Sequence, residues 1–188
     1  MDYRIEQIIN SPAGSHPPID SLMRALAAYS EPAFIALVVI WLIVGLARRS
    51  PQELLGASGA LLSAGLALLI NVALALAWFR PRPFVSHPAT VHVLLAHSRD
   101  SSFPSDHAAA AVAIASILFV FHRRLGVVAL VIALGVGYAR VYVGDHYPGD
   151  AVTGSVVGLI AAWAIYQAYR LSNPWLTQWV KRRTRTGH

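Results

Sequence analysis

Five apolar stretches, separated by short polar segments, constrain this chain to a fold that spans a membrane. They cover residues 32–47, 54–79, 106–121, 125–143 and 150–171. Because about 20 apolar residues in an α-helix cross the hydrocarbon core of a bilayer, the second and fifth stretches are long enough and the fourth is adequate. We expect preceding turns to extend the first and the third. The composition agrees, since 56% of the residues are hydrophobic and only 13% are charged, as is typical of integral membrane proteins.

These stretches predict an all-α integral membrane bundle of five to six transmembrane helices, in a single domain over residues 1–188. No linker, repeat or low-complexity segment divides the chain. Residues 1–30 contain two short amphipathic segments, which we expect to lie in the membrane interface. The second of them, around residues 20–29, is alternatively the beginning of the first span.

The basic residues are distributed unequally between the segments that connect the spans. With five crossings, one side of the membrane holds nine basic residues and one acidic residue, and the other holds six basic and eight acidic residues. Positive charge is retained on the cytoplasmic side, so the first side, which includes the basic tail over residues 172–188, is predicted to be cytoplasmic. The net charge of +6 is therefore assigned to membrane orientation and anionic lipid, not to nucleic acid.

The residue types present limit the chemistry. The chain contains no cysteine, which excludes disulfides, thiolate metal ligands and cysteine nucleophiles. His87, His92 and His97 recur every five residues, but no Asp or Glu accompanies them at a spacing that suits a metal. We therefore predict no metal and no cofactor.

Polar residues gather at three places, all on the side predicted to face away from the cytoplasm. The first is Arg80-Pro81-Arg82-Pro83, where alternating prolines hold the chain extended. A guanidinium group presented there can bind phosphate oxygens in a bidentate manner. Taken alone, the segment is better explained by a basic anchor that contacts lipid headgroups.

The second place is the start of the third apolar stretch. Ser105 is a plausible N-cap residue, and the first amides of a helix, together with its dipole, bind phosphate. His107 lies in the first turn, where it can protonate a leaving oxygen as a general acid. The alternatives are a plain helix cap for Ser105 and an interfacial histidine for His107.

The third place joins the fourth and fifth stretches and contains Arg140, His146 and Asp150. Residues four apart can meet on one helical face, so we expect Asp150 to accept a hydrogen bond from one nitrogen of His146. The other nitrogen would then be available to attack phosphorus, while Arg140 neutralises the transition state. An Asp-His pair that caps a helix beside a structural arginine is the alternative, and spacing alone leaves the two histidine roles interchangeable.

Taken together, the three segments resemble the motifs of the type 2 phosphatidic acid phosphatase superfamily, whose pattern is K-x6-RP, then PSGH, then SR-x5-H-x3-D. The agreement extends over residues 75–150, and the matching positions are Arg82, Pro83, Pro104, Ser105, His107, Arg140, His146 and Asp150. Three positions depart from the pattern, because Ala75 replaces the lysine, Asp106 the glycine and Ala139 the serine.

The resemblance implies a metal-independent phosphatase of helical-bundle fold that works through a phosphohistidine intermediate. By motif position, His146 would be the nucleophile, Asp150 its orienting partner and His107 the acid that protonates the leaving group. The side chains implied to hold the phosphoryl group are Arg82, Arg140 and Ser105.

The departures concern the phosphate contacts. Without a lysine at Ala75, Arg80 is a candidate substitute because it carries the same charge near the same span end. Asp106 adds a negative charge beside the phosphate site. This is unfavourable unless the side chain points away, pairs with an arginine or accepts a hydrogen bond from a second, protonated phosphate.

The Pro-Ser-Asp-His and Arg-Pro-Arg-Pro-Phe sequences, with the short chain, are similar to bacterial undecaprenyl-diphosphate phosphatases of the bacitracin-resistance type. This resemblance implies a multi-pass protein of the bacterial inner membrane that hydrolyses a polyprenyl diphosphate on the outer leaflet, with the prenyl tail in an apolar groove between helices. Competing substrates are phosphatidylglycerophosphate, phosphatidic acid and lipid A. A non-catalytic phospholipid binder or transporter is a further alternative, although a binder needs arginines and no nucleophile. The sequence does not indicate the oligomeric state or the route of substrate entry.

Overall fold

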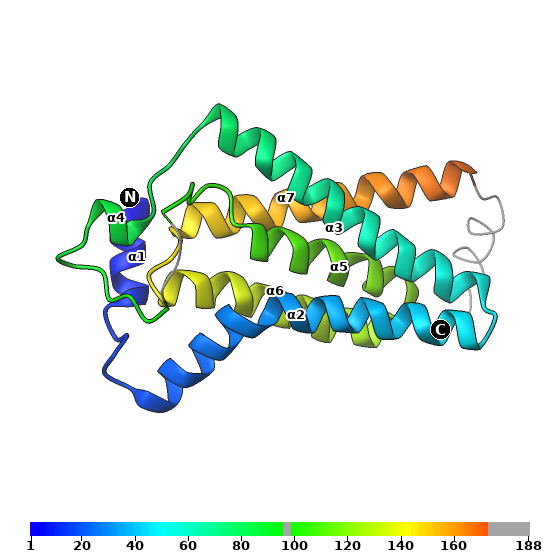
Figure 1. Ribbon diagram of the computed structural model, residues 1–188, viewed down its shortest axis with the longest axis horizontal. Coiled ribbons are helices and arrows are strands. Elements are labelled where there is room, and N and C mark those ends of the chain that lie inside the picture. Colours follow the sequence, from blue (N-terminus) through cyan, green and yellow to red (C-terminus); the bar gives the residue numbers. More distant parts are fainter. Residues whose placement is uncertain (96–98, 173–188) are drawn as a thin grey trace, which may run out of the picture.

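The computed structural model describes residues 1–95 and 99–172, and helices are the only regular secondary structure within them (Figure 1). The helices are α1 (Asp2–Asn10), α2 (Pro17–Ala47), α3 (Pro51–Ala77), α4 (Pro83–Ser86), α5 (Asp106–Phe121), α6 (Arg123–Tyr142) and α7 (Pro148–Ser172). Four of them, α2, α3, α6 and α7, are long and apolar enough to cross a membrane, and α5 is a shorter apolar helix. The predicted all-α membrane bundle is confirmed. Almost all of the predicted basic tail, and His97, lie outside the described residues.

Proline defines where several helices begin. Four helices begin at a proline, namely Pro17, Pro51, Pro83 and Pro148. The amide at the first position of a helix has no acceptor within the helix, so proline loses no hydrogen bond there, and its fixed φ angle is already helical. At α3, the hydroxyl of Ser50 also accepts a hydrogen bond from the Glu53 amide at 3.4 Å, which caps one of the first amides.

The first span is longer than its apolar stretch. Helix α2 begins at Pro17 and continues through Pro32 to Ala47, so residues 20–29 are the beginning of this span and not a separate interfacial helix. Helix α1 is the separate N-terminal helix. The third span, in contrast, is not extended by preceding turns, because α5 begins at Asp106 and has 16 residues. Ser105 before it is already in an extended conformation.

Helix α5 can be short because it is enclosed by the other helices, as Figure 1 shows. Ten of its side chains are buried, and many of these are alanines that let neighbouring helices approach. A Cβ atom at Gly154 of α7 would lie 2.3 Å from the Ser105 carbonyl oxygen, and one at Gly158 would lie 2.3 Å from the carbonyl oxygen of Ala109. Glycine at these two positions therefore allows α7 to pack directly on the backbone of α5.

One end of the bundle collects the polar segments. Helices α1 and α4, the segment before α5 and the α6–α7 turn all lie at this end, where α2 and α3 diverge from the bundle (Figure 1). Segments that are far apart in sequence are thus brought together where the apolar helices end.

Helix α1 carries a buried acidic side chain. Glu6 is fully buried, and neither of its carboxylate oxygens has a hydrogen-bond partner in the described part of the chain. Burial raises the pKa of this carboxyl group to about 7, because the charged form is poorly solvated there. The docked position of α1 therefore favours protonated Glu6. The stability of the folded protein should fall as the pH rises from the ordinary carboxyl pKa through about 7.

We expect Glu6→Gln to raise the melting temperature in detergent, by an amount that grows between pH 5 and pH 8. The glutamine removes an ionisation that costs up to about 3 kcal/mol in the folded state. Arg4→Gln, an exposed change on the same helix, serves as the control. A stabilisation by Glu6→Gln that is the same at every pH would contradict this expectation.

Candidate active site

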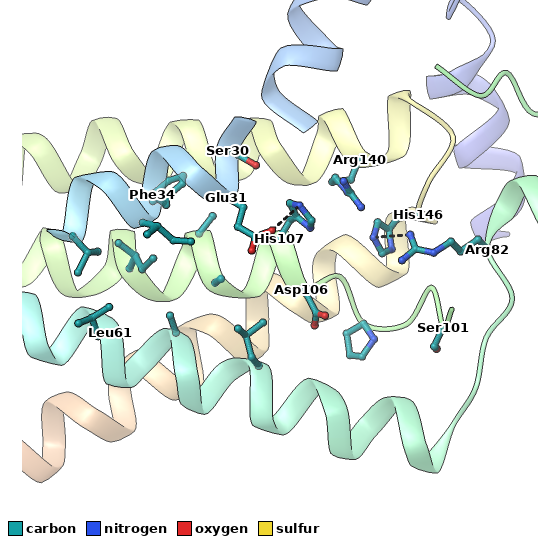
Figure 2. Close-up of a pocket in the computed structure, with 18 residues that line it drawn as sticks. Ser30, Glu31, Phe34, Leu61, Arg82, Ser101, Asp106, His107, Arg140 and His146 are labelled. Atoms are coloured by element: carbon teal, nitrogen blue, oxygen red, sulfur yellow. Dashed lines mark hydrogen bonds and ion pairs between the residues drawn. The ribbon is translucent and has the colours of Figure 1, made fainter. Parts of the chain in front are cut away.

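The three polar segments meet around one cavity of about 290 Å³. The sequence-predicted residues that line it are Arg82, Asp106, His107, Arg140 and His146 (Figure 2). The segments come from the loop after α3, the start of α5 and the α6–α7 connection. The other predicted residues have different contacts, described below.

Asp145 joins the two arginines of the cavity wall. Its Oδ1 accepts a hydrogen bond from Arg82 at 2.7 Å, and its Oδ2 pairs with Arg140. All three side chains are at most 5% exposed, so the carboxylate offsets the repulsion between two buried guanidinium groups. Arg82 also donates through Nε to Asp100 at 2.8 Å. These contacts hold both arginines in fixed positions beside the cavity.

The ring of His146 has two distinct nitrogen environments. Nδ1 lies 2.7 Å from the carbonyl oxygen of Ser102, and Nε2 lies 3.3 Å from a terminal nitrogen of Arg82 (Figure 2). Because a carbonyl oxygen only accepts, the neutral ring carries its proton on Nδ1. Nε2 then has its lone pair beside the arginines, which is the state that a nucleophile requires.

The spacing of His146 and Asp150 predicted a direct hydrogen bond between them, but the structure does not contain it. Asp150 Oδ2 lies 3.8 Å from Nδ1 of His146, which is too long for a hydrogen bond. The same oxygen accepts from the Ser102 hydroxyl at 2.5 Å and from the Tyr147 amide at 2.9 Å. His146 precedes α7, so the two residues do not share a helical face. Ser102 connects them, with its carbonyl at the ring and its hydroxyl at the carboxylate.

Arg80 contacts this carboxylate and is not among the residues that line the cavity in the described structure. It donates to Asp150 Oδ1 at 2.6 Å and to Asp2 at 2.7 Å, and its guanidinium lies 3.9 Å above the Tyr147 ring. Burial alone would lower the pKa of Arg80, but the hydrogen bond to Asp2 and the charge of Asp150 raise it above its ordinary value. The geometry thus places Arg80 behind the Asp150 carboxylate, outside the lining of the cavity.

We expect Arg80→Ala to lower kcat by about tenfold while KM changes little, since the loss acts on the orientation of Asp150 and not on bound phosphate. Steady-state phosphate release by wild type and variant measures both constants. A raised KM with unchanged kcat would instead support the direct phosphate contact that the sequence suggested, and full activity would exclude both roles.

At the start of α5, the backbone agrees with the prediction, but the Ser105 side chain does not cap the helix. Ser105 is the N-cap residue, but its hydroxyl makes no capping hydrogen bond and has no partner among the described residues. Asp106 accepts from the side-chain amide of Asn71 in α3 at 2.7 Å. This hydrogen bond pairs Asp106 with a neutral amide and not with an arginine, and the carboxylate lies on the cavity wall.

His107 faces an acidic residue from another helix. Its Nε2 lies 3.4 Å from a carboxylate oxygen of Glu31 in α2 (Figure 2). Glu31 is exposed and lines the same cavity. A carboxylate at this position can orient the imidazole that is implied to donate a proton.

Several residues that contact the site were not among the predicted site residues, and they include Glu31, Asn71, Ser102 and Asp145. Glu31 and Asn71 carried a usable signal, because they are polar residues near or within apolar stretches, where such groups are costly. Asp145 is an acidic neighbour of a predicted nucleophile. Ser102 gave no signal, since its two contacts depend on the path of the loop.

The cavity continues from its polar end into the bundle. Its apolar walls come from α2, α3 and α5 and include Phe34, Val38, Leu61, Leu68 and Ile114. A polar end with fixed arginines and an apolar extension suits an amphiphile with an anionic head.

An all-helical membrane bundle with two arginines and two histidines around one such cavity defines a class of membrane proteins that handle lipid phosphates. Residues 56–174 match the PAP2 superfamily, and the chain belongs to this family of membrane lipid phosphatases. It is 34% identical to undecaprenyl-diphosphatase BcrC of Bacillus subtilis (strain 168) over 177 residues, which are 94% of this chain and 88% of that protein.

Two crystal structures share the fold. Aquifex aeolicus LpxE superposes with a TM-score of 0.71 at 24% identity, covering 87% of this chain and 93% of that one. The PAP2-type phosphatidylglycerolphosphate phosphatase from Bacillus subtilis gives a TM-score of 0.70 at 24% identity, covering 90% of this chain and 84% of that one.

Proposed function

We propose that this chain hydrolyses undecaprenyl diphosphate to undecaprenyl phosphate and inorganic phosphate through a phosphohistidine intermediate. The observation that carries the proposal is the cavity, in which His146 and two arginines stand at the polar end of an apolar channel. The likeness to an undecaprenyl-diphosphatase over 94% of the chain supports the choice of substrate.

In the first step, Arg82 and Arg140 bind the terminal phosphoryl group and neutralise its oxygens. Nε2 of His146 attacks the terminal phosphorus, and the bond from that phosphorus to the bridging oxygen breaks. His107 gives its proton to the bridging oxygen, which leaves as part of undecaprenyl phosphate.

In the second step, a water molecule attacks the phosphohistidine. His107, now neutral, accepts a proton from this water, the bond between nitrogen and phosphorus breaks, and inorganic phosphate leaves. Asp150 stabilises the positive charge on the His146 ring during both steps, through Ser102 and across 3.8 Å. The two guanidinium groups supply the charge that a metal would otherwise provide, so the proposed reaction is metal-independent.

The apolar channel between α2, α3 and α5 would take the beginning of the prenyl chain. The outer ends of α2 and α3 diverge (Figure 1), and residues of both helices line the cavity, so we expect the lipid to enter between these two helices. The Asp106–Asn71 pair stands at the polar end of the channel, where it can accept a hydrogen bond from a protonated phosphate oxygen.

We further propose that the site faces the outside of the bacterial inner membrane, where the distribution of basic residues places it. A single cysteine at Ser98 is expected to react with an impermeant maleimide in intact cells, whereas one at Arg124 is expected to react only after permeabilisation. The reverse pattern would place the site in the cytoplasm.

The substrate is tested by measuring phosphate release from a panel of lipids with the purified protein and a metal chelator. We expect turnover of undecaprenyl diphosphate to exceed that of phosphatidylglycerophosphate, phosphatidic acid and lipid A, and to continue with chelator present. Turnover of monophosphates alone would reassign the substrate, and loss of activity with chelator would refute the metal-free mechanism. Zero turnover on every lipid would favour a binder or transporter.

A further inference from the structure

Helix α1 contacts both ends of the segment that carries the nucleophile. At its C-terminal end, the buried side chain of Asn10 donates to the Tyr142 carbonyl at 2.8 Å and to the His92 carbonyl at 2.8 Å, and it accepts from the His92 amide at 2.8 Å. At its N-terminal end, Asp2 accepts from the Gly149 amide at 2.9 Å. A helix of nine residues is about 14 Å long, so the two ends reach opposite ends of residues 142–149.

The Asp2 contact continues to the proposed catalytic carboxylate. One oxygen of Asp2 accepts from Gly149, and the other pairs with Arg80 at 2.7 Å. Arg80 uses its second terminal nitrogen for Asp150 at 2.6 Å. A Cβ atom at Gly149 would lie 2.8 Å from Asp2 Oδ2, so glycine at this position permits the close approach.

Asp150 is completely buried, whereas Asp2 is about one third exposed. Arg80 therefore links a buried carboxylate, which needs a fixed countercharge, to a carboxylate at the surface of the site. In the described contacts, the acidic partners of Arg80 are Asp150 and Asp2. Loss of Asp2 would leave the guanidinium held by Asp150 and by the Tyr147 ring alone.

We propose that α1 holds the α6–α7 turn in place, and that Asp2 and Asn10 are positioning residues for His146 and Asp150. The inference rests on the proposed function, because it assigns these two residues to the reaction. Asp2 and Asn10 do not line the cavity, so they act through Arg80 and through the backbone of the turn, and not on bound phosphate.

The test compares Asp2→Asn, Asp2→Glu and Arg4→Gln in the full chain, with kcat and KM for undecaprenyl diphosphate and the melting temperature measured for each. Asp2→Asn keeps the shape and removes the charge, and we expect kcat to fall about tenfold with KM within about twofold. Asp2→Glu should restore most of the rate because it restores the ion pair. Arg4→Gln changes one exposed charge on the same helix and should leave both constants unchanged.

A double-mutant cycle gives a second, independent measurement. If Asp2 acts through Arg80, the Asp2→Asn and Arg80→Ala changes should be non-additive, and the double variant should be about as slow as Arg80→Ala alone. Additive losses would overturn the proposed path from Asp2 through Arg80 to Asp150. Unchanged kcat in Asp2→Asn, or a loss that Asp2→Glu does not recover, would overturn the positioning role of Asp2. An inactive wild type would refute the proposed function itself, which separates the two failures.

Discussion

His146→Ala is expected to lower phosphate release from undecaprenyl diphosphate by about ten-thousand-fold or more. If Nε2 of His146 forms the bond to phosphorus, its removal leaves only binding by the arginines, and loss of a nucleophile is among the largest single effects in enzymes. The measurement is the initial rate of phosphate release by purified protein, with each variant in the same detergent. Substrate binding should persist, because both arginines stay paired with Asp145.

His87→Ala provides the matched control, since this histidine belongs to the same end of the molecule and stacks on Tyr3 at 3.6 Å, outside the cavity lining. It should retain most of the activity. A His146→Ala variant that keeps a substantial fraction of wild-type turnover would assign the nucleophile elsewhere, and His107→Ala would then test the reverse assignment.

Arg140→Gln is expected to reduce both activity and stability. The substitution removes a buried cation that pairs with Asp145, and breaking one partner of a buried pair costs about 3–5 kcal/mol. It also removes a group that neutralises the transition state, for which we expect a loss of at least about a hundredfold in kcat. Thermal unfolding and steady-state kinetics measure the two effects separately.

Arg140→Lys separates charge balance from catalysis. Lysine keeps a positive charge beside Asp145 and should recover part of the stability that Arg140→Gln loses, but it lacks the planar guanidinium that binds phosphate oxygens in a bidentate manner. The activity should stay low. Recovery of the activity together with the stability would show that Arg140 has only a structural role.

The helices could be predicted well from the sequence because their cause is local. Apolar stretches of sufficient length fold as helices in lipid wherever they occur, and the bounds of α5 agree with the predicted stretch at both ends. The prediction was wrong about preceding turns at α5, since a helix enclosed by other helices needs less length than one that faces lipid. It also left open whether residues 20–29 belong to the first span, because an amphipathic pattern fits both arrangements.

The hydrogen bonds and ion pairs of the site could not be predicted, because they are made between loops. Spacing suggested that Asp150 would contact His146 directly, whereas Ser102 lies between them. Charge suggested that Arg80 would bind phosphate, whereas it pairs with Asp150 and Asp2. Sequence patterns report the residue types that chemistry requires, and only the fold decides which of two equivalent charges reaches the substrate.

The role of α1 was also beyond the sequence. Its amphipathic pattern indicated an interfacial helix, and nothing local distinguishes that from a helix that docks on the turn through Asp2 and Asn10. Ile5 and Ile8 of its apolar face are exposed, whereas the buried residues of α1 are Glu6 and Asn10, so the amphipathic pattern does not indicate the docked face.

If His146 carries the phosphoryl group between the two steps, the phosphorylated intermediate can be trapped. Undecaprenyl diphosphate labelled in its terminal phosphate is mixed with enzyme, the reaction is stopped with alkali within the first turnover, and the labelled peptide is identified. We expect an alkali-stable, acid-labile label on His146 that is absent from His146→Ala. Label on another residue, or turnover by His146→Ala at the wild-type rate, would contradict it.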